Sequence, residues 1–260
     1  MLDERLVRAL HVEALRRQEL HAERAPHVLF QASTIGALLE GAYDGDVTFA
    51  ELAEHGDLGL GTLNALDGEM IAVEGHFFRA DVDGAITEID PDARSPFAVL
   101  VWFVPPIDFE LGDPVTHDAF LAALDRRVPG GTAAFAVRID GEFELIKARS
   151  VPRQSPPYRP LAEVVGDQHV FELAQAQGTM VGFRFPDYSE GIEVSGYHLH
   201  FISADRSRGG HVLECTPRRA RVRIDPAADL HVELPAGVDL SAPGLSRETH
   251  EAIDRVEHAG

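Results

Sequence analysis

The sequence has a single cysteine, Cys215, in 260 residues. One thiol excludes a disulfide within the chain and is typical of proteins from a reducing compartment. No apolar run approaches the roughly 20 residues that a membrane-spanning helix needs. The first residues, which are rich in charge, lack the apolar core of a signal peptide. We therefore expect a cytoplasmic protein without a transmembrane segment.

Basic residues are also scarce. The chain carries 23 lysines and arginines against 43 aspartates and glutamates, which gives a formal net charge of −20. Nucleic acids and anionic membranes bind proteins through basic patches, so neither is an expected partner. An anionic substrate would need a metal ion or an arginine to neutralise it locally. In other respects the composition, 45% hydrophobic and 25% charged, is that of an ordinary globular protein.

Strand-like segments outnumber helical ones along the chain. This pattern predicts an α+β fold, with a mostly antiparallel or mixed sheet in each of two β-rich halves and a few helices. Residues 1–26 are highly charged and carry leucines at helical spacing, so we expect an N-terminal helical extension there. Four prolines between Val151 and Pro160 indicate a linker. The predicted division is an extension over 1–26, a mixed-sheet domain over 27–150 and a second β-rich domain over 151–260.

Two local elements are predicted in more detail. Ala134–Ile139 and Phe143–Ala148 flank an Asp-Gly dipeptide, which is favoured in two-residue turns, and so they predict a hairpin about Gly141. A final helix is expected to run to about Glu257.

The strongest chemical signal is a trio of histidines in the second half. His198 and His200 lie two residues apart in a run of aromatic and β-branched residues, which predicts a strand with both imidazoles on one face. The turn-forming segment 205–210 follows, and a second apolar strand then opens with His211. Such a hairpin brings the third histidine beside the first two. A lone His-x-His pair is common by chance, but three histidines with an open fourth position are typical of a catalytic zinc site.

Three charged residues stand out by their setting. Glu69 follows an Asp-Gly turn at the mouth of a strand, from which a carboxylate can point into a cleft. Arg149 ends a strand just before the proline-rich segment, where its guanidinium could hold a carboxylate by two hydrogen bonds. Glu257 lies near the C-terminal end of the expected helix, where the macrodipole disfavours a negative charge. Taken singly, each is more simply explained as an ordinary surface residue.

Several longer motifs follow one another in a fixed order. They are Leu-Phe-Gln-Ala-Ser-Thr at 29–34, Leu-Leu-Glu-Gly-Ala-Tyr-Asp-Gly at 38–45, His-Gly-Asp-Leu-Gly-Leu-Gly-Thr at 55–62, Leu-Asp-Gly-Glu at 66–69, Arg-Ser-Val-Pro at 149–152, Pro-Pro-Tyr at 156–158, Val-Gly-Phe-Arg at 181–184, and the histidine hairpin. Together they resemble the alpha-acetolactate decarboxylase family. The resemblance covers the chain from about Leu29 to the C-terminus.

The resemblance implies one zinc ion per chain and a set of site residues. The family's zinc ligands fall on the trio found from spacing, His198, His200 and His211. Its catalytic residues fall on Glu69, Arg149 and a C-terminal glutamate placed at Glu257, for which Glu251 is a competitor. Thr62 matches a threonine that lines the family's pocket. The resemblance also implies a homodimer in which N-terminal sheets join across the interface.

The implied reaction is the decarboxylation of (S)-2-acetolactate to (R)-acetoin and CO2, in acetoin biosynthesis and the butanediol pathway. Loss of CO2 leaves two electrons that need a sink, and zinc would stabilise the resulting enediolate as a Lewis acid. Arg149 would hold the departing carboxylate and then the charge of the enediolate. Glu69 or Glu257 would protonate one face of the enediolate; the sequence does not decide between them.

Two other functions compete with this one. A cupin-like metal oxygenase also carries His-x-His on a strand, but it adds a carboxylate a few residues downstream and a distant histidine, whereas here the third histidine follows within one hairpin. Oxygen uptake would identify such an enzyme. A non-catalytic metal-binding β module is the second alternative, and zinc content without acetoin formation would favour it.

Overall fold

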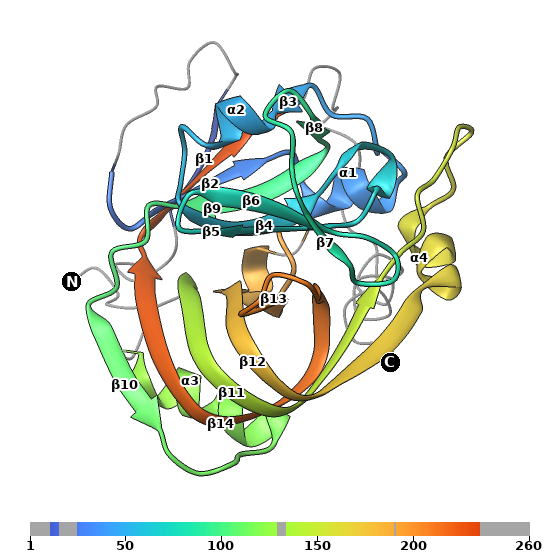
Figure 1. Ribbon diagram of the computed structural model, residues 1–260. Coiled ribbons are helices and arrows are strands. Elements are labelled where there is room, and N and C mark those ends of the chain that lie inside the picture. Colours follow the sequence, from blue (N-terminus) through green and yellow to red (C-terminus); the bar gives the residue numbers. More distant parts are fainter. Residues whose placement is uncertain (1–10, 16–24, 129–133, 190, 235–260) are drawn as a thin grey trace, which may run out of the picture.

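The computed structural model describes residues 11–15, 25–128, 134–189 and 191–234, and its main feature is two β-sheets that face each other (Figure 1). Strand dominates and helices are few, so the predicted α+β class with mixed and antiparallel sheets is confirmed. No helix in the described ranges is long and apolar enough to cross a membrane.

The upper sheet in Figure 1 has eight strands and is mixed. In spatial order they are β1 (His11–Leu15), β15 (Asp229–Glu233), β2 (Val28–Ala32), β9 (Phe97–Val101), β4 (Leu58–Thr62), β5 (Glu69–Val73), β6 (His76–Ala80) and β7 (Ile86–Glu88). The first three strands run parallel to one another, and the later pairs are antiparallel. All residues of β4, β5 and β9 are buried because both faces of the sheet's centre are covered.

The lower sheet has five antiparallel strands, several of them long and strongly curved (Figure 1). In spatial order they are β10 (Ile107–Leu111), β14 (Gly209–Ala227), β11 (Ala134–Ser150), β12 (His169–Phe185) and β13 (Gly196–Ser203). Because β13 also pairs with the first residues of β14, the sheet closes on itself at that end. A small sheet joins β3 (Val47–Thr48) to β8 (Arg94–Ser95).

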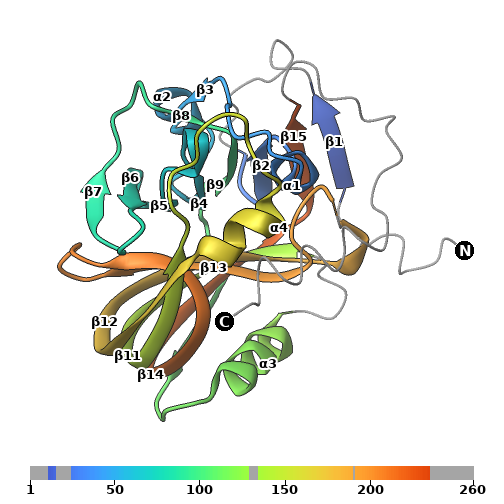
Figure 2. The same cartoon turned by 90° about the vertical axis from the view of Figure 1, so that its right-hand side faces the viewer.

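Short helices cover the sheets. They are α1 (Ile35–Leu39), α2 (Phe49–Leu52), α3 (His117–Arg127) and α4 (Leu161–Val164), with 3-10 turns at Asn64–Leu66, Val165–Asp167 and Asp187–Ser189. Figure 2 shows α3 on the outer face of the five-stranded sheet, where it buries Phe120 and Leu124. The α1 and α4 helices contact each other at one side of the molecule.

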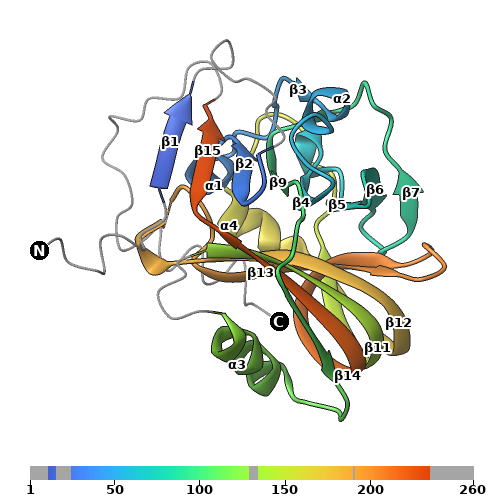
Figure 3. The same cartoon turned by 90° about the vertical axis from the view of Figure 1, so that its left-hand side faces the viewer.

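The predicted N-terminal helix is wrong where the structure describes this part of the chain. His11–Leu15 is a strand, β1, that pairs in parallel with β15 at one edge of the eight-stranded sheet (Figure 3). Backbone hydrogen bonding to a neighbouring strand therefore overrides the helical spacing of the leucines. Residues 1–10 and 16–24, like the expected C-terminal helix, lie outside the described residues.

The two sheets do not follow the predicted division at residues 150 and 151. β10 and β11 precede that point but belong to the five-stranded sheet, and β15 follows it but belongs to the eight-stranded sheet. The chain thus crosses between the sheets twice, once after β9 and once between β14 and β15. Hydrophobic clusters accordingly mix residues from both predicted halves.

The predicted hairpin about Gly141 is also wrong. β11 continues straight through this position and pairs with β12 on one side and β14 on the other. The glycine is needed there for a close approach of strands: a Cβ at this position would lie 2.6 Å from the Cα of Ala220. A glycine that permits tight strand contact has the same local signature as one that permits a turn.

Candidate metal centre and pocket

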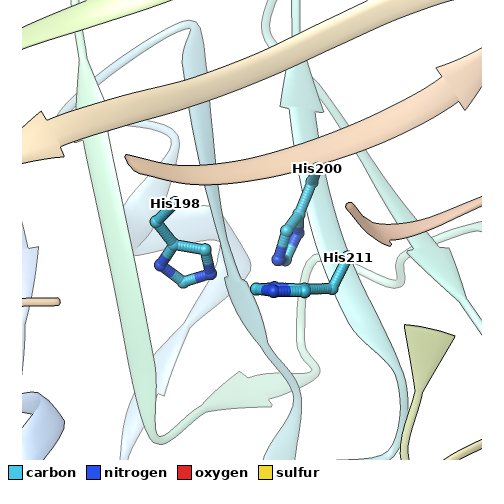
Figure 4. Close-up of side chains that lie close together, drawn as sticks. All are labelled: His198, His200 and His211. Atoms are coloured by element: carbon cyan, nitrogen blue, oxygen red, sulfur yellow. The ribbon is translucent and has the colours of Figure 1, made fainter. Parts of the chain in front are cut away.

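The predicted histidine hairpin is confirmed. β13 carries His198 and His200, and β14 returns beside it so that His200 and His211 are directly paired across the two strands. Directly paired residues, and residues two apart on one strand, point to the same face. The three imidazoles therefore point toward one another (Figure 4), with ring centroids 5.1 to 5.3 Å apart.

The trio has the features of a metal site. One ligand nitrogen from each histidine lies within 4.8 Å of the others, and all three residues are buried. The Nδ1 of His200 donates a hydrogen bond to the backbone carbonyl of Met70 at 2.8 Å, which leaves the lone pair on Nε2. Among the described residues no hydrogen bond reaches this buried Nε2. An imidazole held by its far nitrogen, with its near nitrogen aimed at its neighbours, is the usual arrangement of a metal ligand.

The protonation state of His200 agrees with its assignment as a candidate metal ligand. Burial lowers the pKa of His200 well below its ordinary value, and the nearby charges of His198 and Arg149 lower it further. His200 is therefore neutral at pH 7, as a histidine must be to donate its lone pair to a metal. Three histidine nitrogens in a buried setting suit zinc, and a tetrahedral zinc ion held by three ligands would have its fourth position open.

Arg149 and Glu69 lie beside the trio and contact each other. Arg149 is paired with His211 across β11 and β14, so that Arg149, His211 and His200 form one row over three neighbouring strands. Its Nη1 donates to Oε1 of Glu69 at 3.1 Å, and Oε2 of Glu69 lies 3.7 Å from Nε2 of His200. The arginine is 5% exposed and the glutamate 7%. The guanidinium and the carboxyl group are thus paired in a site largely screened from water.

A pocket of about 440 Å³, measured with its open mouth, joins these groups. The polar residues of its lining are Thr62, Glu69, Arg149, His198 and His211. Thr62 is paired with Glu69 across β4 and β5, and its hydroxyl donates to the carbonyl of Gly68 at 2.8 Å. The apolar residues of its lining are Ile35, Leu38, Leu66, Phe97, Val151 and Leu161. The lining thus suits a small molecule that carries both polar and apolar groups.

The resemblance implied a site of seven residues, and the structure brings six of them together: His198, His200, His211, Glu69, Arg149 and Thr62. Glu257 and Glu251 lie outside the described residues. Two features were missed. The carbonyl of Met70 leaves no side-chain signal, because any residue supplies one. The apolar lining of the pocket comes from segments up to 126 residues apart (Ile35 to Leu161), each of which resembles ordinary core.

A protein-family model described as Alpha-acetolactate decarboxylase matches residues 29–246. The chain belongs to this family. The predicted resemblance is therefore confirmed, and so is the prediction of a carboxy-lyase.

Individual relatives agree with the family model. The alpha-acetolactate decarboxylase of Methylococcus capsulatus is 48% identical over 89% of this chain and 89% of its own length. That of Methanosarcina mazei is 40% identical over 91% of this chain and 82% of its own. The crystal structure of alpha-acetolactate decarboxylase from Bacillus subtilis strain 168 superposes with a TM-score of 0.84 at 36% identity, and it covers 89% of this chain and 99% of that one. The family's fold is thus present nearly in full.

Proposed function

We propose that this chain decarboxylates (S)-2-acetolactate to (R)-acetoin and CO2, with a zinc ion held by His198, His200 and His211. The observation that carries the proposal is one pocket in which three buried histidines meet a buried Arg149–Glu69 pair. Relatives up to 48% identical are named for this decarboxylation. A cupin-like oxygenase finds less support, because all three histidines come from one hairpin.

The metal ion and Arg149 would both stabilise negative charge on the substrate. A zinc ion held by His198, His200 and His211 would supply Lewis acidity, which would stabilise the negative charge that develops on the substrate as CO2 departs. The guanidinium of Arg149, whose Nη1 contacts Glu69, carries its N–H donors in a planar fork that suits the substrate's carboxylate. Its fixed position at the pocket would orient the bond to be broken. Arg149 would also offset the negative charge that a chain of net charge −20 presents to an anion.

The reaction also needs one proton. The bond between carbon 2 and the carboxylate breaks, its electron pair stays on the substrate, and a proton takes the place of CO2 on carbon. Glu69 is the carboxyl group among the described residues of the pocket lining, and Arg149 fixes its orientation. Donation of this proton by Glu69 to one face of the enediolate would give one enantiomer of acetoin. Glu257 remains the alternative donor.

An acetoin assay with 2-acetolactate tests the proposal. Purified protein should form acetoin, lose this activity after treatment with a chelator and regain it when zinc is added. Dissolved oxygen is measured during the same assay and serves as the control for oxygenase activity. Full turnover by metal-free protein would contradict the zinc mechanism. Oxygen consumption would favour the oxygenase, and bound zinc without acetoin formation would favour a non-catalytic module.

Other properties of this enzyme stay predictions from the sequence and the resemblance. These are the homodimer, the cytoplasmic location and the catalytic role of the C-terminal glutamate.

A further inference from the structure

The turn between β4 and β5 has an unusual backbone. Ala65 and Leu66 are consecutive residues with positive φ, 62° and 52°. Residues with a Cβ rarely adopt this left-handed region, and two in succession are rarer. Both are buried, with 6% and 2% exposure, so solvent does not determine this conformation.

Hydrogen bonds from distant segments hold the turn in this form. The N–H of Ala65 donates to the carbonyl of Tyr43 at 2.8 Å, and the N–H of Gln154 donates to the carbonyl of Ala65 at 2.7 Å. The side-chain amide of Asn64 accepts from the N–H of Gly45 and donates to its carbonyl, each at 2.9 Å. A strained backbone that its surroundings fix so fully is characteristic of functional sites.

The strained turn places its two leucines in different surroundings. Leu66 is one of the apolar residues that line the pocket, three residues before Glu69. Leu63, at 9% exposure, belongs to a separate hydrophobic cluster and is not among the residues that line this pocket. The left-handed backbone thus holds Leu66 in the turn that connects Thr62 to Glu69, which are paired across β4 and β5.

We infer that Leu66 determines which alkyl group on carbon 2 of the substrate the pocket accepts. The inference rests on the proposed function. The polar residues of the pocket would bind the substrate's oxygens and carboxylate, so its methyl groups are left to contact the apolar lining residues, of which Leu66 is one. Because the backbone at Leu66 is pinned, this side chain has little freedom to move away from a larger group. Its size would therefore limit the size of the alkyl substituent.

The test compares two substrates, 2-acetolactate and its homologue with an ethyl group on carbon 2. Leu66→Ala should raise the ratio of kcat/KM for the ethyl over the methyl substrate by about tenfold, since one methylene in an apolar pocket changes discrimination by that order. Leu66→Met keeps the volume of the side chain but adds flexibility, so it should also raise this ratio, by less than Leu66→Ala does. A substrate preference is a readout that a merely structural role would leave unchanged.

Leu63→Ala is the matched control, because it removes the same atoms from the same turn without opening the pocket. It should lower thermal stability and leave the ratio as in the wild type. If the wild type decarboxylates 2-acetolactate but both Leu66 variants keep its ratio, the inference is wrong. If Leu66→Ala does not fold, Leu66→Met decides alone. A wild type that does not act on 2-acetolactate would instead refute the proposed function.

Discussion

The two sheets contribute different parts of the site. The five-stranded sheet supplies the three histidines and Arg149 from paired positions on neighbouring strands, so that hydrogen bonds within one sheet fix their spacing. The eight-stranded sheet supplies Thr62 and Glu69 and the carbonyl of Met70. The histidine trio is therefore formed locally by one hairpin, whereas the complete pocket exists only when the two sheets are packed together.

Polar contacts join the sheets at the site. One is the hydrogen bond from His200 to the Met70 carbonyl at 2.8 Å, and another is the Arg149–Glu69 pair at 3.1 Å. The first fixes the ring of a candidate metal ligand, and the second places a carboxylate beside the histidine trio. Substitutions at this contact between the two sheets should thus distinguish residues needed for metal binding from residues needed only for catalysis.

The largest effect is expected on the five-stranded side. His200→Ala removes one of three buried nitrogen donors and should reduce both bound zinc and acetoin formation to background. Metal analysis and the acetoin assay on the same preparation measure the two effects. His76→Ala is the control, because His76 lies exposed on β6 in the other sheet and should keep zinc and activity. A fully active His200→Ala protein would show that the trio is not the site.

On the eight-stranded side the two effects should separate. Glu69→Gln keeps the shape of the side chain and an oxygen for Arg149, but it cannot transfer a proton. Bound zinc should stay near the wild-type level while kcat falls by about 10²–10⁴-fold, the usual contribution of a positioned acid or base. Metal analysis and kcat are again measured together. Loss of zinc in this variant would make Glu69 part of the metal site, and unchanged kcat would remove it from catalysis.

The sequence predicts best what is local. The histidine hairpin needs only strand alternation, a turn-forming segment and pairing, all within His198 to His211. The partners Glu69 and Arg149 are 80 residues apart, and their contact depends on how the sheets pack. No periodicity encodes that packing, so their common site came only from the resemblance to a family.

The failed predictions have a common physical cause. His11–Leu15 and β11 are both determined by pairing with strands that are remote in sequence. β15 joins the eight-stranded sheet although the 19-residue strand just before it belongs to the other. For His11–Leu15 and β11, tertiary hydrogen bonding overrides a local signal, which is helical spacing in the first and an Asp-Gly dipeptide in the second.

The smallest effect on activity is expected far from the contact between the two sheets at the site. Gly141 lies eight residues before Arg149 on β11, about 26 Å away along an extended strand. Because a Cβ at Gly141 would meet the backbone of Arg219 and Ala220 at 2.6 Å, Gly141→Ala should lower the free energy of unfolding by about 1–3 kcal/mol. The kcat of the folded variant should equal that of the wild type.

Urea denaturation measures this change, with Gly112→Ala as the matched control. Nothing lies within 4 Å of a Cβ built at Gly112, so the same substitution there should leave stability unchanged or raise it by up to about 1 kcal/mol. If Gly141→Ala were as stable as the control, close strand contact would not explain why the chain keeps glycine at a position that resembles a turn. If folded Gly141→Ala protein had a lower kcat than the wild type, the far end of the five-stranded sheet would be energetically coupled to the site. The site would then depend on more of this sheet than the strand ends that carry its residues.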